Sequence, residues 1–261
     1  MILAPLPAAD QEAFRARFGV DPHTELYGQT ECMPITFTPV SGVRDRGGCG
    51  TPVGDLEIAL LDDDGAAVDP GGVGEIAVRP RGRHCMFDGY WDQPEATLEA
   101  IRGLWYHTGD YGRLTPSGAL HFVDRKKDAL RRRGENISSL ELETAIRTHP
   151  KIADVAVHGV PSPRTEDDVK ACLVLAAGVA VSPGELFTFF TEQLPHYAVP
   201  RYIEILDELP RNAVGRVMKH LLRERPQHAG VWDFERLGLR VTRSDRRPEP
   251  RRQMEPEGSI T

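Results

Sequence analysis

The chain has 261 residues, of which 40% are hydrophobic and 27% are charged, and its formal net charge is −7. This composition is typical of a globular protein with one large domain or two ordinary ones. The acidic balance argues against nucleic acid as the main partner because phosphate binding needs a clustered basic face, and no apolar run approaches the roughly 20 residues of a membrane span.

The four cysteines, Cys32, Cys49, Cys85 and Cys172, are scattered along the chain without a Cys-x-x-Cys pair. This spacing indicates neither a zinc site nor a disulfide framework. Residues 1–7 lack the basic segment of a signal peptide. We therefore expect a cytoplasmic protein with reduced cysteines.

The first predicted elements lead into a polar motif. Residues 10–18 have the apolar spacing of a short helix, and residues 24–27 are typical of a buried strand end. The strand is followed by Tyr27-Gly-Gln-Thr-Glu31. Open α/β sheets place ligands at the carboxyl ends of strands, but five residues alone fit a plain polar turn equally well.

Residues 47–124 are predicted to be rich in β-structure. Four segments have the pattern of strands, at residues 56–61, 74–79, 104–114 and 119–123. Glycine-containing turns at residues 62–65 and 115–118 predict hairpins. The region also contains Trp105-Tyr-His-Thr-Gly-Asp110, whose aspartate could accept bonds from vicinal hydroxyls or simply form a turn.

Residues 122–139 join this region to a second, α+β unit, and the charged run within them is by itself typical of a solvated connector. Ser138 and Glu141 form a capping box that opens a helix to about residue 149. Further elements are predicted as strands at 152–160, 169–175 and 202–206 and helices from 183 and over 218–223. Residues 226–261 are predicted to be a largely disordered extension, in which only 231–239 could pack.

Three motifs in a fixed order carry a resemblance to a known family. Residues 27–31, 106–110 and 124–137 resemble the adenylate-forming (AMP-binding) acyl-CoA synthetases, and the likeness extends from about residue 4 to residue 225. The amino-acid sequences of residues 131–139 and 197–202 are most similar to those of carnitine- or crotonobetaine-CoA ligases. Such enzymes use ATP and Mg²⁺ to convert a carboxylate into an acyl-adenylate, and coenzyme A then displaces AMP.

The resemblance implies a fold of α/β plus α+β class. Residues 1–124 would be the end of a large α/β adenylation domain with a β-rich subdomain over 47–124. Residues 125–225 would form a small α+β carboxyl-terminal domain, followed by the extension.

Nucleotide and metal contacts are also implied by the resemblance. Tyr27 would flank the adenine, and Gly28 and Thr30 would contact the nucleotide, with Thr30 at its phosphates. Glu31 would help to hold Mg²⁺, a hard cation that favours carboxylate and phosphate oxygens.

Further roles follow from the later motifs. Asp110 would hold the ribose hydroxyls with the help of Arg125, whose planar fork of donors suits them. Lys127 would be the hinge about which the small domain turns. Gly134 would let the backbone approach the pantetheine arm. Glu135 is part of the Glu-Asn-Ile sequence at residues 135–137, which favours coenzyme A as acceptor.

The catalytic lysine of the family has no exact counterpart. The family has Gly-Lys in the loop after the last strand, where this chain has Gly215-Arg216. Lys219 lies three residues further on. Either Lys219 has taken the role by a shift of register, which we favour slightly, or Arg216 supplies the charge; Lys219 could equally be an ordinary helix residue.

A second departure concerns the phosphate-binding loop that family members carry upstream of the segment resembled by Ala4-Pro5. No Gly-x-x-x-x-Gly-Lys pattern occurs in the chain. We expect a truncated or split acyl-CoA ligase that is inactive alone and that has a separate amino-terminal half as partner. The alternatives are a non-catalytic nucleotide or coenzyme A binding module, a degenerate remnant, or a relative with another acceptor.

Overall fold

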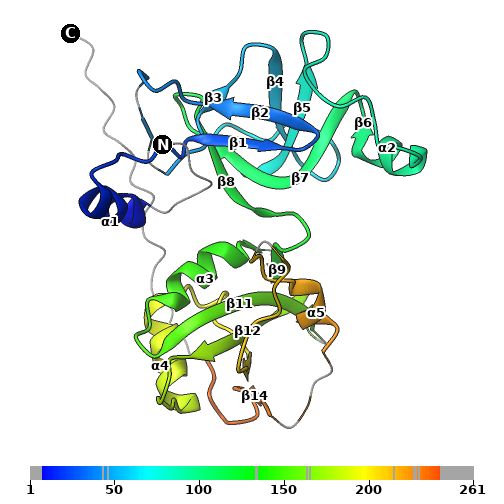
Figure 1. The fold of residues 1–261 in the computed structure, drawn as a ribbon. Coiled ribbons are helices and arrows are strands. Elements are labelled where there is room, and N and C mark those ends of the chain that lie inside the picture. The colour runs from blue at the N-terminus through cyan, green and yellow to red at the C-terminus, as the bar shows by residue number, and fades with distance from the viewer. Residues whose placement is uncertain are drawn as a thin grey trace, which may run out of the picture. The chain divides into compact units, whose positions relative to one another are not determined.

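The computed structural model describes residues 8–42, 44–45, 47–132, 135–162, 164, 166–213, 215–225, 228 and 230–241. The chain divides into two compact units, Met1–Lys127 and Asp128–Thr261 (Figure 1). This division falls three residues after the boundary expected at 124/125. None of the described helices is long and apolar enough to cross a membrane.

The first unit consists mainly of antiparallel strands. Its elements are α1 (Ala8–Phe18), β1 (Leu26–Gln29), β2 (Cys32–Phe37), β3 (Thr51–Pro52), β4 (Leu56–Leu61), β5 (Gly74–Pro80), α2 (Pro94–Ala100), β6 (Ile101–Arg102), β7 (Trp105–Leu114) and β8 (Leu120–Arg125). One sheet has the order β1-β2-β3, and the other has the order β4-β5-β7, with β6 and β8 both paired to β7. Side chains from both sheets, among them Ile35 of β2 and Ile76 of β5, form one core.

The four strands predicted between residues 56 and 123 are present within two residues of the expected bounds. Their turns have the expected chemistry, because Gly65 and Gly118 adopt φ angles of 80° and 82°, which favour glycine. The Asp62 carboxylate accepts the backbone N–H groups of Asp64 and Ala66. Local turn residues therefore position β4 against β5 and β7 against β8.

The expectation for the first motif needs a correction. The strand does not end at Tyr27: β1 starts at Leu26 and runs to Gln29, and a tight turn at 30–31 returns the chain into β2. The sheet is antiparallel, with Gln29 opposite Cys32. The motif is therefore the end of a hairpin and not the carboxyl edge of a parallel sheet.

The second unit is an α+β structure. Its elements are β9 (Leu130–Arg132), β10 (Glu135–Ile137), α3 (Ser139–Arg147), β11 (Ile152–Pro161), β12 (Asp167–Leu175), α4 (Pro183–Gln193), β13 (Tyr202–Ile205), α5 (Lys219–Arg223) and β14 (Val231–Asp233). The main sheet has the order β11-β12-β13-β14, in which only β12 and β13 are parallel. Ser138 caps α3 by accepting the N–H group of Glu141, as predicted, and Ser182 caps α4 by accepting the N–H group of Glu185.

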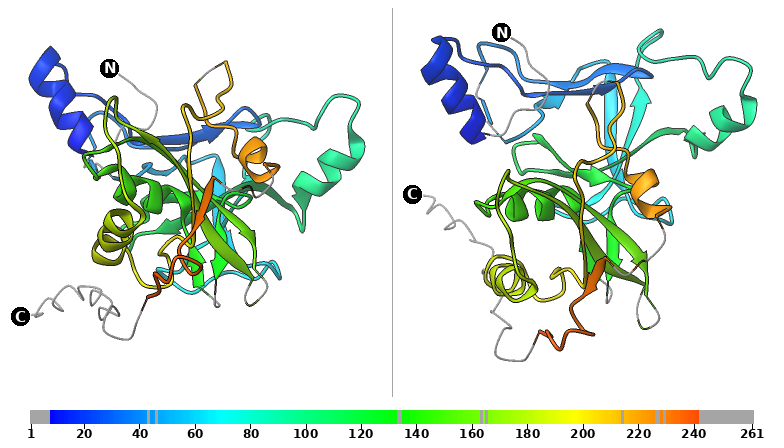
Figure 2. Two further views of the ribbon diagram at one scale, coloured as in Figure 1. Left: turned by 90° about the horizontal axis from the view of Figure 1, so that it is seen from below. Right: turned by 60° about the horizontal axis from the view of Figure 1, so that its bottom comes forward.

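The two faces of this sheet carry different helices, which Figure 2 shows from two further directions. Val155 and Val157 of β11 lie in the core that includes residues of α3 and α4. Ala156, between them, lies in a smaller cluster with Leu222 of α5. This alternation is the period of two that a β-strand imposes.

The described part of the extension packs against the second unit. Val231 to Asp233 form β14, which pairs with β13. Phe234 is 1% exposed and contacts the rings of Phe187 and Phe190. The apolar residues recognised at 231–239 thus pack, while residues 242–261 lie outside the described part of the chain.

Candidate functional site

Asp110 is the centre of the candidate site in the first unit. Its carboxylate is 8% exposed, and the Oδ2 atom accepts the Tyr27 hydroxyl at 2.7 Å and the Gln29 amide at 2.8 Å. Within the described part of the chain, no donor reaches Oδ1 with a hydrogen bond. The motifs at 27–31 and 106–110, distant in sequence, therefore meet at one carboxylate.

Gln29 fixes this arrangement and was not singled out from the sequence. Its Nε2 also donates to the Thr108 carbonyl at 3.0 Å, and its Oε1 accepts the Tyr106 hydroxyl at 2.5 Å. Tyr27 and Gln29 flank Gly28 on β1, and both side chains reach the same oxygen of Asp110. That spacing inside the quoted motif is the signal that could have identified Gln29.

The protonation states of the site follow from burial. Burial raises the pKa of Asp110, although the bonds from Tyr27 and Gln29 and the charge of Arg125 act in the opposite direction. Burial and the Asp110 charge raise the pKa of Tyr27, which keeps its phenol protonated as a donor. Arg125 of β8 lies opposite Asp110 of β7 in the sheet register, which gives the two expected ribose-binding residues neighbouring positions.

The backbone around Asp110 is held by a buried carboxylate, Glu75 of β5. Glu75 is 3% exposed, and its Oε1 accepts the Gly109 N–H at 3.2 Å; the glycine has a φ angle of 70°. Its Oε2 accepts Lys126 Nζ at 3.1 Å and lies 3.1 Å from His107 Nδ1. Burial would raise the pKa of Glu75, but the bonds from Lys126 and His107 lower it below the ordinary value. Glu75 was missed because nothing in the sequence links it to residues 107–126.

The remaining residues of the first motif lie at the hairpin end. A Cβ atom on Gly28 would lie 2.4 Å from Met33 Sδ and 3.1 Å from the Cys32 carbonyl, so glycine permits this close approach. Thr30 is exposed in the turn. The Oε1 atom of Glu31 accepts the Tyr90 hydroxyl at 2.8 Å, and burial followed by this bond raises the pKa of Tyr90.

Glu31 would supply one protein ligand to Mg²⁺. Among the described residues, no group of three or more histidines, cysteines or carboxylates is placed to hold a metal ion. Mg²⁺ is commonly bound through one or two carboxylates together with substrate phosphates and water. The donor set is therefore compatible with a metal that arrives with a nucleotide.

The two candidate catalytic residues have different surroundings in the second unit. Lys219 Nζ lies 2.7 Å from Glu143 Oε1 and donates to Ser139 Oγ at 2.7 Å, and its side chain is 13% exposed. Arg216 is exposed in the loop before α5, and its N–H donates to the Asn212 side chain at 2.9 Å. Lys219 is thus engaged in an ion pair, whereas Arg216 is exposed on its loop.

The expected hinge and coenzyme A residues lie around the start of the second unit. Lys127 is exposed and is the last residue of the first unit. Gly134 lies outside the described residues. Glu135 begins β10, where its backbone pairs with Arg132 of β9.

Comparison with known proteins gives two family matches. A model described as "AMP-binding enzyme" matches residues 2–91, and a model described as "AMP-binding enzyme C-terminal domain" matches residues 141–216. A crotonobetaine/carnitine–CoA ligase of Salmonella arizonae is 36% identical over 84% of this chain and 42% of its own length. A long-chain-fatty-acid–CoA ligase of Escherichia coli O157:H7 is 39% identical over 77% of this chain and 35% of its own length.

Solved structures are similar over the same extent. ATP-bound MatB from Rhodopseudomonas palustris has a TM-score of 0.76 at 30% identity, covering 85% of this chain and 44% of that one. The o-succinylbenzoate CoA synthetase of Bacillus subtilis in complex with its acyl-adenylate intermediate has a TM-score of 0.73 at 30% identity, covering 87% and 46%. These structures confirm the predicted fold class. The chain spans less than half the length of the curated relatives, and the matches lie in their carboxyl-terminal part.

Proposed function

We propose that the chain functions as part of an ATP-dependent acyl-CoA ligase. It belongs to the AMP-binding family of adenylate-forming enzymes and matches the carboxyl-terminal part of its members. In that reaction a carboxylate attacks the α-phosphorus of ATP and releases pyrophosphate. The thiol of coenzyme A then attacks the acyl-adenylate and releases AMP. We further propose a cytoplasmic setting, which the four free cysteines support.

The observation that carries this proposal is the Asp110 carboxylate. Tyr27 and Gln29 both donate to Oδ2, so they fix the plane of the carboxylate and leave Oδ1 to accept from a ribose hydroxyl. Arg125, opposite on β8, would add donors for the ribose oxygens. A preorganised acceptor of this kind costs little to arrange when the nucleotide binds.

The other groups of the first motif would act on the phosphates. Thr30 and the backbone near Gly28 would lie along the polyphosphate, and Glu31 would hold Mg²⁺ together with phosphate oxygens. Such a metal, when bound, neutralises charge on the phosphates. Glu31 can offer Oε2 for this purpose because the Tyr90 bond goes to Oε1.

The second unit would supply the charge near the α-phosphate and the contacts to coenzyme A. Arg216, on an exposed loop, would stabilise negative charge that develops as the carboxylate attacks. Gly134 and Glu135 would lie along the pantetheine arm after rotation about Lys127. The acyl substrate is a small-molecule carboxylate, with carnitine-like and fatty acids as first choices because of the two named relatives.

The experiment combines this chain with the amino-terminal portion of a crotonobetaine/carnitine–CoA ligase. Pyrophosphate release is measured with ATP, Mg²⁺ and a panel of carboxylates. We expect release only when both parts are present, followed by formation of an acyl-CoA thioester. No release with any carboxylate would refute the ligase proposal.

A second candidate is a non-catalytic nucleotide or coenzyme A binding module. It is favoured by one observation: arginine follows Gly215, and the nearby Lys219 is engaged with Glu143. Calorimetry of the chain alone with AMP and coenzyme A distinguishes the possibilities further. Binding without any pyrophosphate release in the combined system supports the module, and absence of binding to either ligand contradicts the module.

A further inference from the structure

Arg132 is a buried cation on a short strand. It is 7% exposed, and it follows Leu130, which is 2% exposed in the main core, by two residues on β9. Arg131 between them is exposed, so Leu130 and Arg132 occupy the inward face of β9. An arginine in a core position destabilises the fold unless its charge and donors are satisfied.

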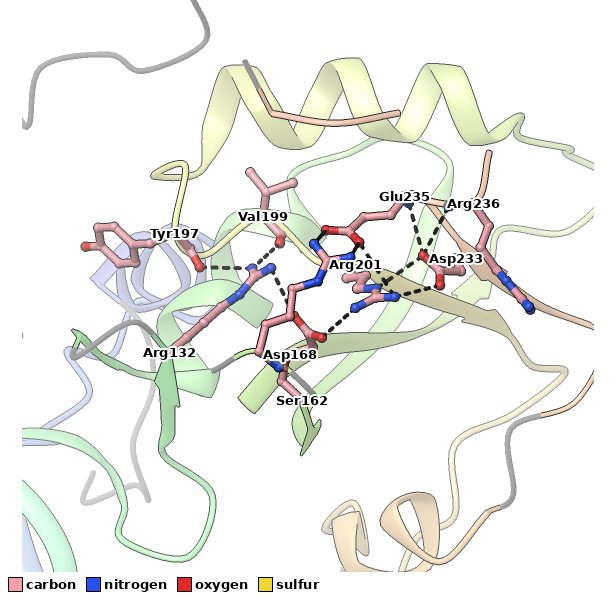
Figure 3. Close-up of polar contacts among 10 residues, drawn as sticks. Arg132, Ser162, Asp168, Tyr197, Val199, Arg201, Asp233, Glu235 and Arg236 are labelled. Atoms are coloured by element: carbon pink, nitrogen blue, oxygen red, sulfur yellow. Dashed lines mark hydrogen bonds and ion pairs between the residues drawn. The ribbon is translucent and has the colours of Figure 1, made fainter. Parts of the chain in front are cut away.

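The two Nη groups of Arg132 donate to three acceptors, which Figure 3 shows together. Nη1 donates to the Tyr197 carbonyl at 3.1 Å and to the Val199 carbonyl at 2.9 Å. Nη2 donates to Asp168 Oδ1 at 3.2 Å. The strand β9 is therefore fastened both to the loop before β13 and to β12.

The contacts continue from Asp168 to the end of the sheet. Asp168 Oδ2 accepts Arg201 Nη1 at 2.9 Å (Figure 3). Arg201 then binds Asp233 with a fork, from Nε to Oδ1 at 3.2 Å and from Nη2 to Oδ2 at 3.1 Å. We call Arg132, Asp168, Arg201 and Asp233 the arginine–aspartate chain. Its charges alternate and cancel, which allows four ionic side chains to lie largely buried.

Asp233, at the other end of the arginine–aspartate chain, is fixed in place by the strand β14. It is the last residue of β14 and lies opposite Tyr202 of β13. The next residue, Phe234, is buried and donates its N–H to the Arg201 carbonyl at 3.0 Å. The bond from Asp233 raises the pKa of Arg201. β14 lies beyond residue 216, where the family match ends, so the extension adds an anchor to the matched domain.

Arg132, at the first end of the arginine–aspartate chain, sets the position of β10. Arg132 is the register partner of Glu135, and Arg131 N donates to Asp167 Oδ2 at 3.3 Å as a second tie to β12. Given the proposed function, on which this step rests, Glu135 belongs to the coenzyme A contact. We propose that Arg132 is a positioning residue for coenzyme A, and that β14 maintains its orientation through Asp233, Arg201 and Asp168.

The test measures coenzyme A and AMP binding to the full chain by calorimetry. Asp233→Asn removes the anchor without placing a new group in the core, and we expect it to weaken coenzyme A binding about fivefold while AMP binding, which uses the first unit, is unchanged. Arg132→Gln should weaken coenzyme A binding more. Asp233→Glu keeps the charge and should restore most of the affinity.

A matched control is Arg164→Gln, which breaks an exposed ion pair of Arg164 with Glu235 beside the same strand. It should leave both affinities unchanged. Hydrogen exchange provides a readout without coenzyme A: peptides covering 130–132 and 135–137 should exchange faster in Asp233→Asn, while those covering β4 and β5 should not.

The outcomes separate this inference from the proposed function. If the unmodified chain binds both ligands and Asp233→Asn alters neither coenzyme A affinity nor exchange in the hairpin, the positioning role is refuted and the ligase proposal stands. Equal weakening of AMP and coenzyme A binding would mean general destabilisation and would also refute it. Faster exchange in a chain that binds no coenzyme A would support the mechanical link and contradict coenzyme A as acceptor.

Discussion

The ammonium of Lys219 and the carboxylate of Glu143 form an ion pair at 2.7 Å in the second unit, with side chains only 13% and 12% exposed. The same Glu143 oxygen accepts the Val157 N–H at 2.8 Å. The pair therefore joins α5 to α3 and β11. If Lys219 turned towards a substrate, this largely buried ion pair would be broken, which is costly.

This ion pair predicts that substitution of Lys219 affects stability, whereas substitution of Arg216 affects catalysis. Lys219→Met should lower the free energy of unfolding of the second unit by about 3 kcal/mol, because it removes the largely buried Lys219–Glu143 ion pair. Arg216→Ala should leave stability unchanged because Arg216 is exposed, but it should slow pyrophosphate release about 100-fold in the combined system. Urea unfolding and pyrophosphate assays measure the two quantities.

Lys151→Met is the control for Lys219, since it removes a half-exposed lysine that pairs with Glu185. It should alter neither unfolding nor catalysis. A Lys219→Met protein with normal stability and no pyrophosphate release would return the catalytic role to Lys219.

A second prediction concerns the pH dependence of nucleoside binding. Burial raises the pKa of Asp110, so its carboxylate is protonated at a higher pH than an ordinary aspartate of pKa about 3.9. The neutral acid accepts ribose hydroxyls poorly, and adenosine affinity should therefore fall as pH decreases from 7 towards 4. Adenosine is the probe because it carries no phosphate that titrates in this range.

Asp110→Asn should bind adenosine about tenfold more weakly at pH 7 and should show a flat pH profile. Asp69→Asn, at an exposed position of the same unit, should behave as the unmodified chain. An unchanged affinity in Asp110→Asn would remove Asp110 from the site.

Local patterns predicted the hairpins β4–β5 and β7–β8 and the helices α1, α3, α4 and α5. They did not predict α2 or the β1–β2 hairpin, and the partners that define the site come from distant positions. The strands at 56–61 and 74–79 were predictable because turn residues and alternation lie within a few positions. β2 was missed because Pro34 interrupts it, and proline argues against a strand interior. The two- and three-residue strands have too few positions to show a period.

The candidate site likewise combines residues that local motifs predict with residues that only the three-dimensional structure brings together. Tyr27 and Asp110 could be predicted from motifs that resemble a family, but Glu75 is recognised only when β5 and β7 are paired. Likewise, Arg216 and Lys219 are equivalent as basic residues in one short segment, and only the contact with Glu143 distinguishes them. Sequence patterns report neighbours along the chain, and these residues act through neighbours in space.

A third prediction tests Glu75 as the residue that holds the Gly109 turn. Glu75→Ala should destabilise the first unit by about 3 kcal/mol, because it leaves the Gly109 N–H, His107 and the Lys126 ammonium without a buried acceptor. Adenosine affinity should fall with it, since Asp110 follows Gly109 directly. Glu75→Gln should retain part of both properties by accepting one bond.

Glu57→Gln on the neighbouring strand serves as the comparison, because Glu57 pairs with Arg79 at the surface. We expect no measurable change in unfolding or adenosine binding. Full adenosine affinity in a destabilised Glu75→Ala chain would show that Glu75 supports the fold without orienting Asp110.

The last prediction concerns acid stability of the second unit and arises from His158. This histidine of β11 is 1% exposed, with Nδ1 2.9 Å from the Gly159 carbonyl and Nε2 3.9 Å from Cys172 Sγ. Burial, assisted by the charge of Lys170, lowers the pKa of His158 to about 4 from an ordinary value of 6.5. Between these values the unfolded chain binds a proton that the folded chain does not, so stability should decrease as pH falls from 6.5 to 4, by about 3 kcal/mol in total.

His158→Gln should remove this loss, and exposed His220→Gln should retain it. Glu204, whose pKa is lowered to about 2 by its bonds with Lys170, His228 and Arg225 against the effect of burial, loses its stabilising contribution only below about 4.5. The interval from pH 6.5 to 4.5 therefore isolates His158. Urea unfolding followed by Trp232 fluorescence, with Trp91 and Trp105 replaced by phenylalanine, measures the slope, and an equal slope in His158→Gln would contradict the assignment.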